Sequence, residues 1–245
     1  MKTKVLQMGA DNFGAGGRSV IAYNLTRPLT DDFQVDFLAI GKLKNPSFHR
    51  IIEENGGYVQ HVKEASSKIK RLRSIYSILK KEKYDIVHIN ADDAIEGVFN
   101  IILSKLSGAK IVLHAHNTSS SRGEGFIGRL KMLSAKKIVN FLVDYKMACS
   151  LEAADYLYGD TDLSDVAIIK NGIIINDFLY NEELRQNVRE NLNIPMEAIV
   201  LGTVGRLSYQ KNPEFMVSLI QTLFSKAPNF YFIWIGDGEE RASIE

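Results

Sequence analysis

Two basic side chains lie in a short loop late in the chain. Residues 199–204 (IVLGTV) are strand-like, Arg206 and Lys211 follow them, and Pro213 opens a helical pattern. A guanidinium can bind two oxygens at once and an ammonium supplies a compact charge, so the pair suits a diphosphate. Ligands of open α/β sheets bind where such strands end. We therefore predict a diphosphate site at Arg206 and Lys211; two exposed surface charges are the alternative.

A glycine-rich segment follows the first apolar stretch, where residues 11–19 read DNFGAGGRS. Glycines allow close backbone approach to a ligand, and the helix that follows directs free N–H groups at the loop. The spacing does not give G-x-G-x-x-G because residue 19 is serine, and no acidic residue ends the second strand, which argues against NAD. We expect Gly16 and Gly17 to bind a polar or phosphorylated ligand, unless the glycines serve only the turn.

Histidines end two other apolar stretches. His114, His116 and Asn117 follow one another closely, and His88 lies near the end of an earlier stretch. Two histidines at i, i+2 are compatible with a metal, but no cysteine or carboxylate stands at ligand spacing, so we expect no zinc. We predict hydrogen bonds to sugar hydroxyls or phosphate. A satisfied core histidine is the alternative for His116 and, less strongly, for His114. Both interpretations stay open for His88.

The elements that must position these residues alternate between short apolar stretches and amphipathic helical patterns. The predicted strands are residues 4–8, 34–40, 58–62, 85–89, 110–114, 145–149 and 166–169, and clear helical patterns cover 67–83, 94–106 and 127–143. This alternation predicts a parallel sheet covered on both faces. The fold class is α/β, with residues 1–176 forming one doubly wound, Rossmann-like domain.

The rest of the chain is organised differently. Residues 177–198 are expected to be a linker with a polar helix, and residues 199–245 to be part of a second domain. Its strands, 199–204 and 231–235, are typical of fully buried interior strands. A two-stranded sheet is marginal by itself, so we expect the chain to be a fragment of a longer protein.

Composition narrows the classes of function. The 30 basic and 29 acidic residues give no field that marks a nucleic-acid binder, and the single cysteine, Cys149, excludes an internal disulfide. No stretch approaches the length of a membrane span, so we expect a cytoplasmic protein. The basic helix at 67–83 raises the hypothesis of contact with the inner face of the membrane; a solvated helix face is the alternative.

Taken together, these motifs resemble the family 4 glycosyltransferases of the GT-B fold, particularly bacterial exopolysaccharide and capsule enzymes. The resemblance covers essentially the whole chain. It rests on residues 16–18 (GGR), 84–88 (YDIVH), 113–118 (LHAHNT), 148–150 (ACS), 169–173 (IKNGI, with Asn171) and Phe178. It continues through 204–207 (VGRL), 210–213 (QKNP) and 235–238 (IGDG, with Gly236, Asp237 and Gly238).

The resemblance implies that the first domain binds a glycan or lipid-linked acceptor and the second binds a nucleotide-sugar donor, with a UDP-sugar the expected one. Arg206 and Lys211 would hold the donor diphosphate and neutralise the departing nucleotide. Gly16 and Gly17 would bring N–H groups to the phosphates or to the acceptor, and His114 would contact the transferred sugar. Such enzymes retain the anomeric configuration and need no metal.

Two departures from the family pattern matter. Asn90 stands where many relatives carry a second histidine after His88. Relatives also carry a Glu-x7-Glu segment well after the Gly-Asp-Gly turn, which binds donor sugar and ribose, and residues 239–245 contain no such segment. The chain alone is therefore expected to be inactive. A nucleotide-sugar 2-epimerase of the same fold is one alternative, distinguished by its independence of an acceptor, and a non-catalytic, truncated binding protein is another.

Overall fold

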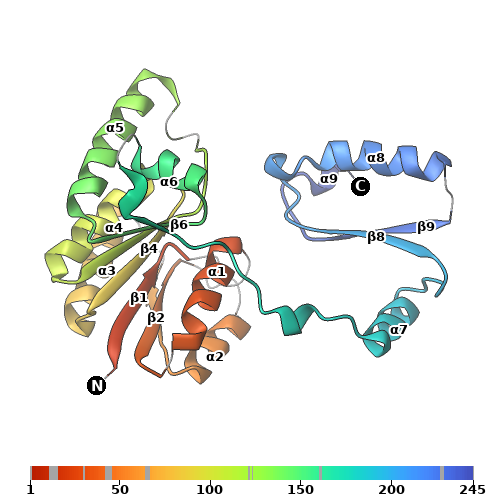
Figure 1. Cartoon of the computed structure of the whole chain (residues 1–245), viewed down its shortest axis with the longest axis horizontal. Coiled ribbons are helices and arrows are strands. Elements are labelled where there is room, and N and C mark those ends of the chain that lie inside the picture. The colour runs from red at the N-terminus through yellow and green to blue at the C-terminus, as the bar shows by residue number, and fades with distance from the viewer. Residues whose placement is uncertain are drawn as a thin grey trace. The chain divides into compact units, whose positions relative to one another are not determined.

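The computed structural model describes residues 2–10, 16–29, 31–41, 46–63, 67–120, 122, 124–159, 162–226 and 229–244. The chain divides into two compact units, Met1–Ile174 and Ile175–Glu245. The sequence placed the end of the first domain at 176, close to this division. Each unit has its own sheet (Figure 1).

The first unit is built on a seven-stranded, entirely parallel sheet with strand order β3-β2-β1-β4-β5-β6-β7. Its strands are β1 (Thr3–Met8), β2 (Phe33–Ile40), β3 (Val59–Val62), β4 (Ile86–Ala91), β5 (Lys110–Ala115), β6 (Tyr145–Ala148) and β7 (Val166–Ile168). Its helices are α1 (Gly17–Thr26), η1 (Arg27–Leu29), α2 (Pro46–Glu54), α3 (Lys68–Glu82), α4 (Ala94–Ser107), α5 (Gly125–Leu142), α6 (Leu151–Tyr158) and η3 (Leu163–Asp165). Every predicted strand of this domain is present within two residues of its predicted ends.

Side-chain alternation in the central strands separates two cores. On one face Leu6, Met8, Val87 and Ile89 pack against α3, α4, α5 and α6. On the other face Val5 joins a smaller core with α1 and α2. Successive residues of a strand point to opposite faces, so each strand serves both layers. The doubly wound α/β architecture is therefore confirmed.

Helix ends in this unit follow local chemistry. Asp93 caps α4 by accepting a hydrogen bond from the Glu96 backbone N–H at 2.8 Å, and Gly108 ends the same helix at φ 93°. A side-chain oxygen at the N-cap satisfies a free N–H group, and glycine takes the left-handed conformation without a steric cost. These caps fix α4 directly after β4. No helix in the described part of the chain is both long and apolar enough to span a membrane.

The second unit contains a two-stranded parallel sheet of β8 (Ile199–Val204) and β9 (Phe230–Ile235). Its helices are η4 (Ile175–Phe178), α7 (Glu182–Asn191), η5 (Tyr209–Lys211), α8 (Pro213–Lys226) and α9 (Arg241–Ile244). The expectation of fully buried strands is wrong for this chain. Ile199 is 66% exposed and Ile235 is 60% exposed, because α8 and α9 do not provide the two layers that cover a parallel sheet.

The packing of the main core predicts that truncating two residues of α4 lowers the free energy of unfolding by different amounts. Ile101 is fully buried, whereas Leu106 is largely exposed. We expect Ile101→Ala to lower the free energy of unfolding by about 2–5 kcal/mol, because truncation leaves a cavity. Leu106→Ala, measured by the same urea titration, should change it by less than about 0.5 kcal/mol. Equal losses in both variants would contradict this placement of the core.

Candidate functional site

A stripe of polar side chains crosses the sheet where β1, β4 and β5 end. Gln7 is in register with His88, and Asn90 is in register with His114. His88 and Asn90 are two residues apart, as are His114 and His116, so each pair shares one face of the sheet. Gln7, His88, Asn90 and His114 are all buried, and His116 is half-buried. The sheet therefore brings the three predicted histidines together.

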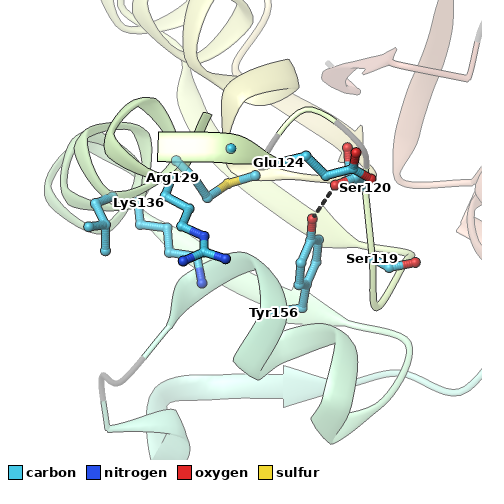
Figure 2. A pocket seen from close by; sticks show the side chains of 9 residues that line it. Ser119, Ser120, Glu124, Arg129, Lys136 and Tyr156 are labelled. Atoms are coloured by element: carbon cyan, nitrogen blue, oxygen red, sulfur yellow. Dashed lines mark hydrogen bonds between the residues drawn. The ribbon is translucent and has the colours of Figure 1, made fainter. Parts of the chain in front are cut away.

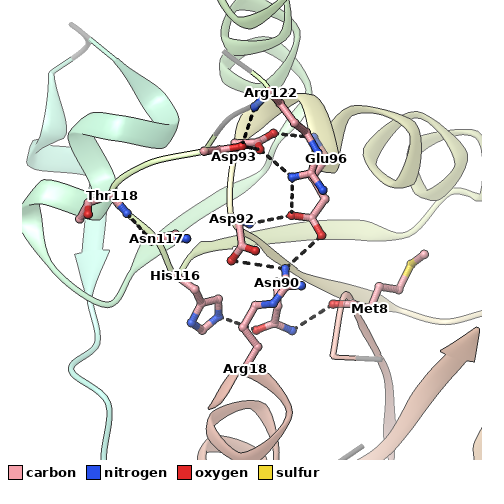
Figure 3. A network of polar contacts seen from close by, with 11 residues as sticks. Met8, Arg18, Asn90, Asp92, Asp93, Glu96, His116, Asn117, Thr118 and Arg122 are labelled. Carbon is pink, nitrogen blue, oxygen red and sulfur yellow. Dashed lines mark hydrogen bonds and ion pairs between the residues drawn. The ribbon is translucent and has the colours of Figure 1, made fainter. Parts of the chain in front are cut away.

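Asn90 connects this polar stripe. Its Nδ2 donates to Gln7 Oε1 at 2.9 Å and to the Met8 carbonyl at 3.1 Å, while Oδ1 accepts from His116 Nε2 at 2.8 Å. Gln7 Nε2 in turn donates to His88 Nδ1 at 3.0 Å. Figure 3 shows Asn90 between Met8 and His116. The departure at Asn90 thus has a structural role, because one amide both donates to β1 and orients the imidazole of His116.

The three imidazoles lie ring against ring. The His88 and His114 centroids are 5.5 Å apart with nearly parallel planes, and those of His114 and His116 are 4.1 Å apart. Burial lowers the pKa of His114 to about 4, and burial together with the neighbouring His114 ring lowers the pKa values of His88 and His116 to about 3. All three rings are therefore neutral at pH 7, where an imidazole both donates and accepts one hydrogen bond.

The burial of these rings differs from the sequence-based expectation. His114 has no exposed surface, whereas His116 is half-buried. Yet His114 is not a satisfied core histidine, since neither ring nitrogen has a hydrogen-bond partner among the described residues. His88 Nε2 is also unpartnered there. Buried polar atoms without partners are uncommon, which marks this stripe as a place where a polar ligand group would be stabilised.

A charged cluster that the sequence reasoning missed borders the stripe. Arg18 lies 3.1 Å from Glu96 and 3.6 Å from Asp92, and Arg122 lies 2.8 Å from Asp93. Burial raises the pKa of Asp92, whose carboxylate is at the end of β4. Burial would also raise the pKa of Asp93, but hydrogen bonds from Ser120 and Arg122 lower it overall. The Asp-x-x-Glu spacing of a helix cap was the available sequence signal.

The remaining candidates of the first unit occupy loops around the stripe. Gly16 is the N-cap residue of α1, and a Cβ added at Gly17 would meet no described atom within 4 Å, so packing does not demand glycine there. Residues 11–15 of the glycine-rich segment lie outside the described residues. Asn117 Oδ1 accepts from the Thr118 backbone N–H at 3.0 Å. Asn171 is exposed in a loop held to α1 by Asn24, which donates to the Gly172 carbonyl.

The basic loop of the second unit packs backbone to backbone against the Gly-Asp-Gly turn. Leu207 N–H donates to the Asp237 carbonyl at 3.1 Å. A Cβ at Gly236 would lie 1.9 Å from the Gly205 carbonyl oxygen, and one at Gly238 would lie 2.0 Å from that of Leu207. Only glycine permits this approach. The turn therefore supports the loop through its main chain.

Arg206 and Lys211 are both exposed on this supported loop, and no carboxylate among the described residues forms an ion pair with either. The Lys211 stem runs beside Gly205, where an added Cβ would come within 4.0 Å of it. Trp234 Nε1 donates to the Gly205 carbonyl at 3.0 Å. The loop thus presents two uncompensated cations on a fixed backbone, an arrangement suited to an anionic ligand. No group of metal-binding side chains is found among the described residues.

The neutral histidines predict acid sensitivity of the first unit. Their pKa values lie below the ordinary 6.5 in the folded chain, so the unfolded chain binds more protons below that pH. The free energy of unfolding should be unaffected by these groups above pH 6.5 and fall as the pH drops toward 4, by about 1.4 kcal/mol per pH unit for each histidine.

Urea unfolding of the chain at several pH values between 7.5 and about 4 measures this slope. The variant His116→Gln keeps a donor for Asn90 and removes one titrating ring, so its slope should be about one third smaller. A stability that does not change with pH over this range, or an identical slope in the variant, would show that the rings do not titrate as described.

Comparison with known proteins shows which family and which relatives the chain is similar to. The model of Glycosyltransferase Family 4 matches residues 15–177. The candidate glycosyltransferase EpsF of Bacillus subtilis (strain 168) is 24% identical over 94% of this chain and 61% of its own length. The UDP-Gal:alpha-D-GlcNAc-diphosphoundecaprenol alpha-1,3-galactosyltransferase of Escherichia coli is 28% identical over 70% of this chain and 45% of its own length. The chain therefore spans less than two thirds of the length of these relatives.

A solved structure shows the same fold. Anabaena Alr3699/HepE, in complex with UDP and glucose, matches 98% of this chain and 63% of its own with a TM-score of 0.75 and 19% identity. That likeness confirms the GT-B-like fold class, and the matched family model covers most of the seven-stranded unit. The chain belongs to Glycosyltransferase Family 4.

Proposed function

We propose that the protein transfers a sugar from a nucleotide-sugar donor to a glycan or lipid-linked acceptor, with retention of anomeric configuration. The observation that carries this proposal is the pair of exposed cations, Arg206 and Lys211, on a loop that the Gly-Asp-Gly turn supports. A leaving nucleoside diphosphate gains negative charge as the glycosidic bond breaks. Fixed cations beside it stabilise the transition state more than the ground state, and in this proposal they take the place of a divalent ion.

The donor is proposed to be a UDP-sugar. The E. coli relative is named for UDP-Gal, and Alr3699/HepE was solved with UDP and glucose. In the first unit, His114 stays the proposed contact to the transferred sugar because both of its ring nitrogens lack partners among the described residues. Its ring has no exposed surface, so a sugar reaches it only if neighbouring atoms shift. His116 and Asn117 are the more accessible hydrogen-bonding groups beside it.

The acceptor is proposed to be a saccharide on a lipid carrier, as the name of the E. coli relative describes for that protein. With such an acceptor the enzyme acts at the cytoplasmic face of a membrane, in polysaccharide biosynthesis. An epimerase of the same fold would need no acceptor, so acceptor-dependent release of nucleotide separates the two functions. We also propose that these 245 residues, which span 61% of the length of EpsF and 45% of that of the E. coli relative, bind the nucleotide without turnover.

The chain offers an internal probe for nucleotide binding. Trp234 is the single tryptophan and donates to Gly205, the residue before Arg206. We expect UDP to change its fluorescence, and UMP to bind more weakly because it lacks the second phosphate. Arg206→Ala and Lys211→Ala should each weaken UDP binding about tenfold, the loss typical of one charge-assisted hydrogen bond.

The matched control is Lys226→Ala, which removes an exposed cation from the far end of α8. It should leave the UDP affinity unchanged. Binding that is insensitive to Arg206 and Lys211, or equally sensitive to Lys226, would contradict the proposed diphosphate site. Turnover of labelled UDP-sugar by this chain would contradict the proposal that it is inactive alone.

A further inference from the structure

Helix α5 carries apolar side chains on two opposite sides. Its inner side buries Met132, Ala135 and Val139 in the main core. Ile127, Leu130 and Phe141 lie on the outer side, at helical spacing, and all three are exposed. Phe126 and Phe141 are 84% and 86% exposed, near the two ends of the helix. A helix that is apolar on both sides is normally buried on both, so the outer side is expected to have an occupant.

The charge on α5 has one sign. Arg129, Lys131, Lys136 and Lys137 all lie between Gly125 and Leu142, and that segment contains no acidic residue. None of these four forms an ion pair in the described part of the chain. Apolar side chains flanked by unpaired cations are the pattern of helices that lie in the interface of an anionic bilayer.

Two grooves flank this helix. One, of about 510 Å³, is lined by apolar atoms of α5 and by the polar residues Ser119, Ser120, Glu124, Arg129, Lys136 and Tyr156. Figure 2 shows Arg129 on one side of this groove and Tyr156 on the other. The second, of about 540 Å³, lies between α4 and α5, with Lys68 and Lys131 beside the apolar side chains of Phe99, Leu130 and Ile138. Each groove thus combines an apolar lining with two cations, and the first also contains the carboxylate of Glu124, so both grooves carry more positive than negative charge.

We propose that the outer side of α5 and its two grooves, defined here as the α5 surface, contact the headgroup region of an anionic membrane. The cations would bind lipid phosphates and the phenyl groups would enter the acyl boundary. This inference rests on the proposed function, since a lipid-linked acceptor brings the enzyme to a bilayer. Ser119 and Ser120 line a groove and directly follow Asn117 and Thr118, so the contact holds the polar stripe close to the lipid surface.

A second copy of the chain fits the α5 surface less well. A twofold contact places the same patch of both copies face to face. Here it would bring together the four α5 cations of each copy, against the Glu124 carboxylate of each. Like charges in a desolvated contact are repulsive. The basic helix α3, the sequence-based candidate for membrane contact, has cations but exposes few large apolar side chains, with Ile69 near its start. The α5 surface has both properties.

Vesicle co-sedimentation of the whole chain tests the proposal. We expect binding to an equal mixture of phosphatidylglycerol and phosphatidylcholine and little binding to phosphatidylcholine alone. Phe126→Ser with Phe141→Ser should weaken binding more than about tenfold, because two exposed rings no longer enter the bilayer. Lys131→Gln with Lys137→Gln should weaken it about tenfold or more through lost attraction to the anionic surface.

The matched control is Lys80→Gln with Lys81→Gln, which removes the same charge from the last turn of α3. It should bind vesicles more tightly than the α5 charge variant. Equal losses in the α3 and α5 charge variants, or no effect of the phenylalanine changes, would overturn the proposal. Sedimentation velocity without lipid adds another decisive outcome, since self-association abolished by the phenylalanine changes would identify a second copy as the occupant.

The same variants should keep the UDP-induced change in Trp234 fluorescence, because the mutated residues belong to the first unit and the basic loop to the second. Membrane binding and nucleotide binding are therefore read separately. A change in vesicle binding with intact UDP binding tests the α5 surface only. A loss of UDP binding with intact vesicle binding tests the proposed function only.

Discussion

The parallel register of β1, β4 and β5 is the constraint on which the first unit depends. It aligns Gln7 with His88 and Asn90 with His114, so that one face of the sheet carries a continuous polar stripe while the other carries the main apolar core. A slip of one residue would exchange the two faces. The hydrogen bonds of Asn90 to β1 and to His116 oppose such a slip, because a slip would leave several buried polar groups without partners.

In the second unit, backbone contacts hold the candidate site in place. Its basic loop is supported main chain to main chain, because the backbone of Gly236 and Gly238 approaches it too closely for any side chain. This backbone contact fixes the positions of Arg206 and Lys211 although both side chains are exposed. The candidate site of the first unit consists of buried neutral rings, whereas that of the second unit consists of exposed cations.

The two sides of helix α5 have different surroundings. It completes the main core with one side and presents apolar and cationic groups with the other. A helix that only packed against the core would carry polar residues on its exposed side, as surface helices do. The sequence pattern 127–143 predicted the helix but not the exposure of its second apolar side. Both α3 and α5 are basic in the sequence, and only packing shows which of them leaves aromatic rings in solvent.

The sequence by itself determined the order of elements, the parallel α/β class, the family and the basic loop, because short apolar strands and residue types at strand ends are local properties. Tertiary structure decided what depends on neighbours distant in sequence. It buried His114 and left His116 half-buried, contrary to expectation, and it gave Asn90 its partners on β1. It also joined Arg18 to Asp92 and Glu96, which lie far from it in the chain, in one cluster. Burial and pairing are properties of the assembled sheet, and no spacing in a single strand encodes them.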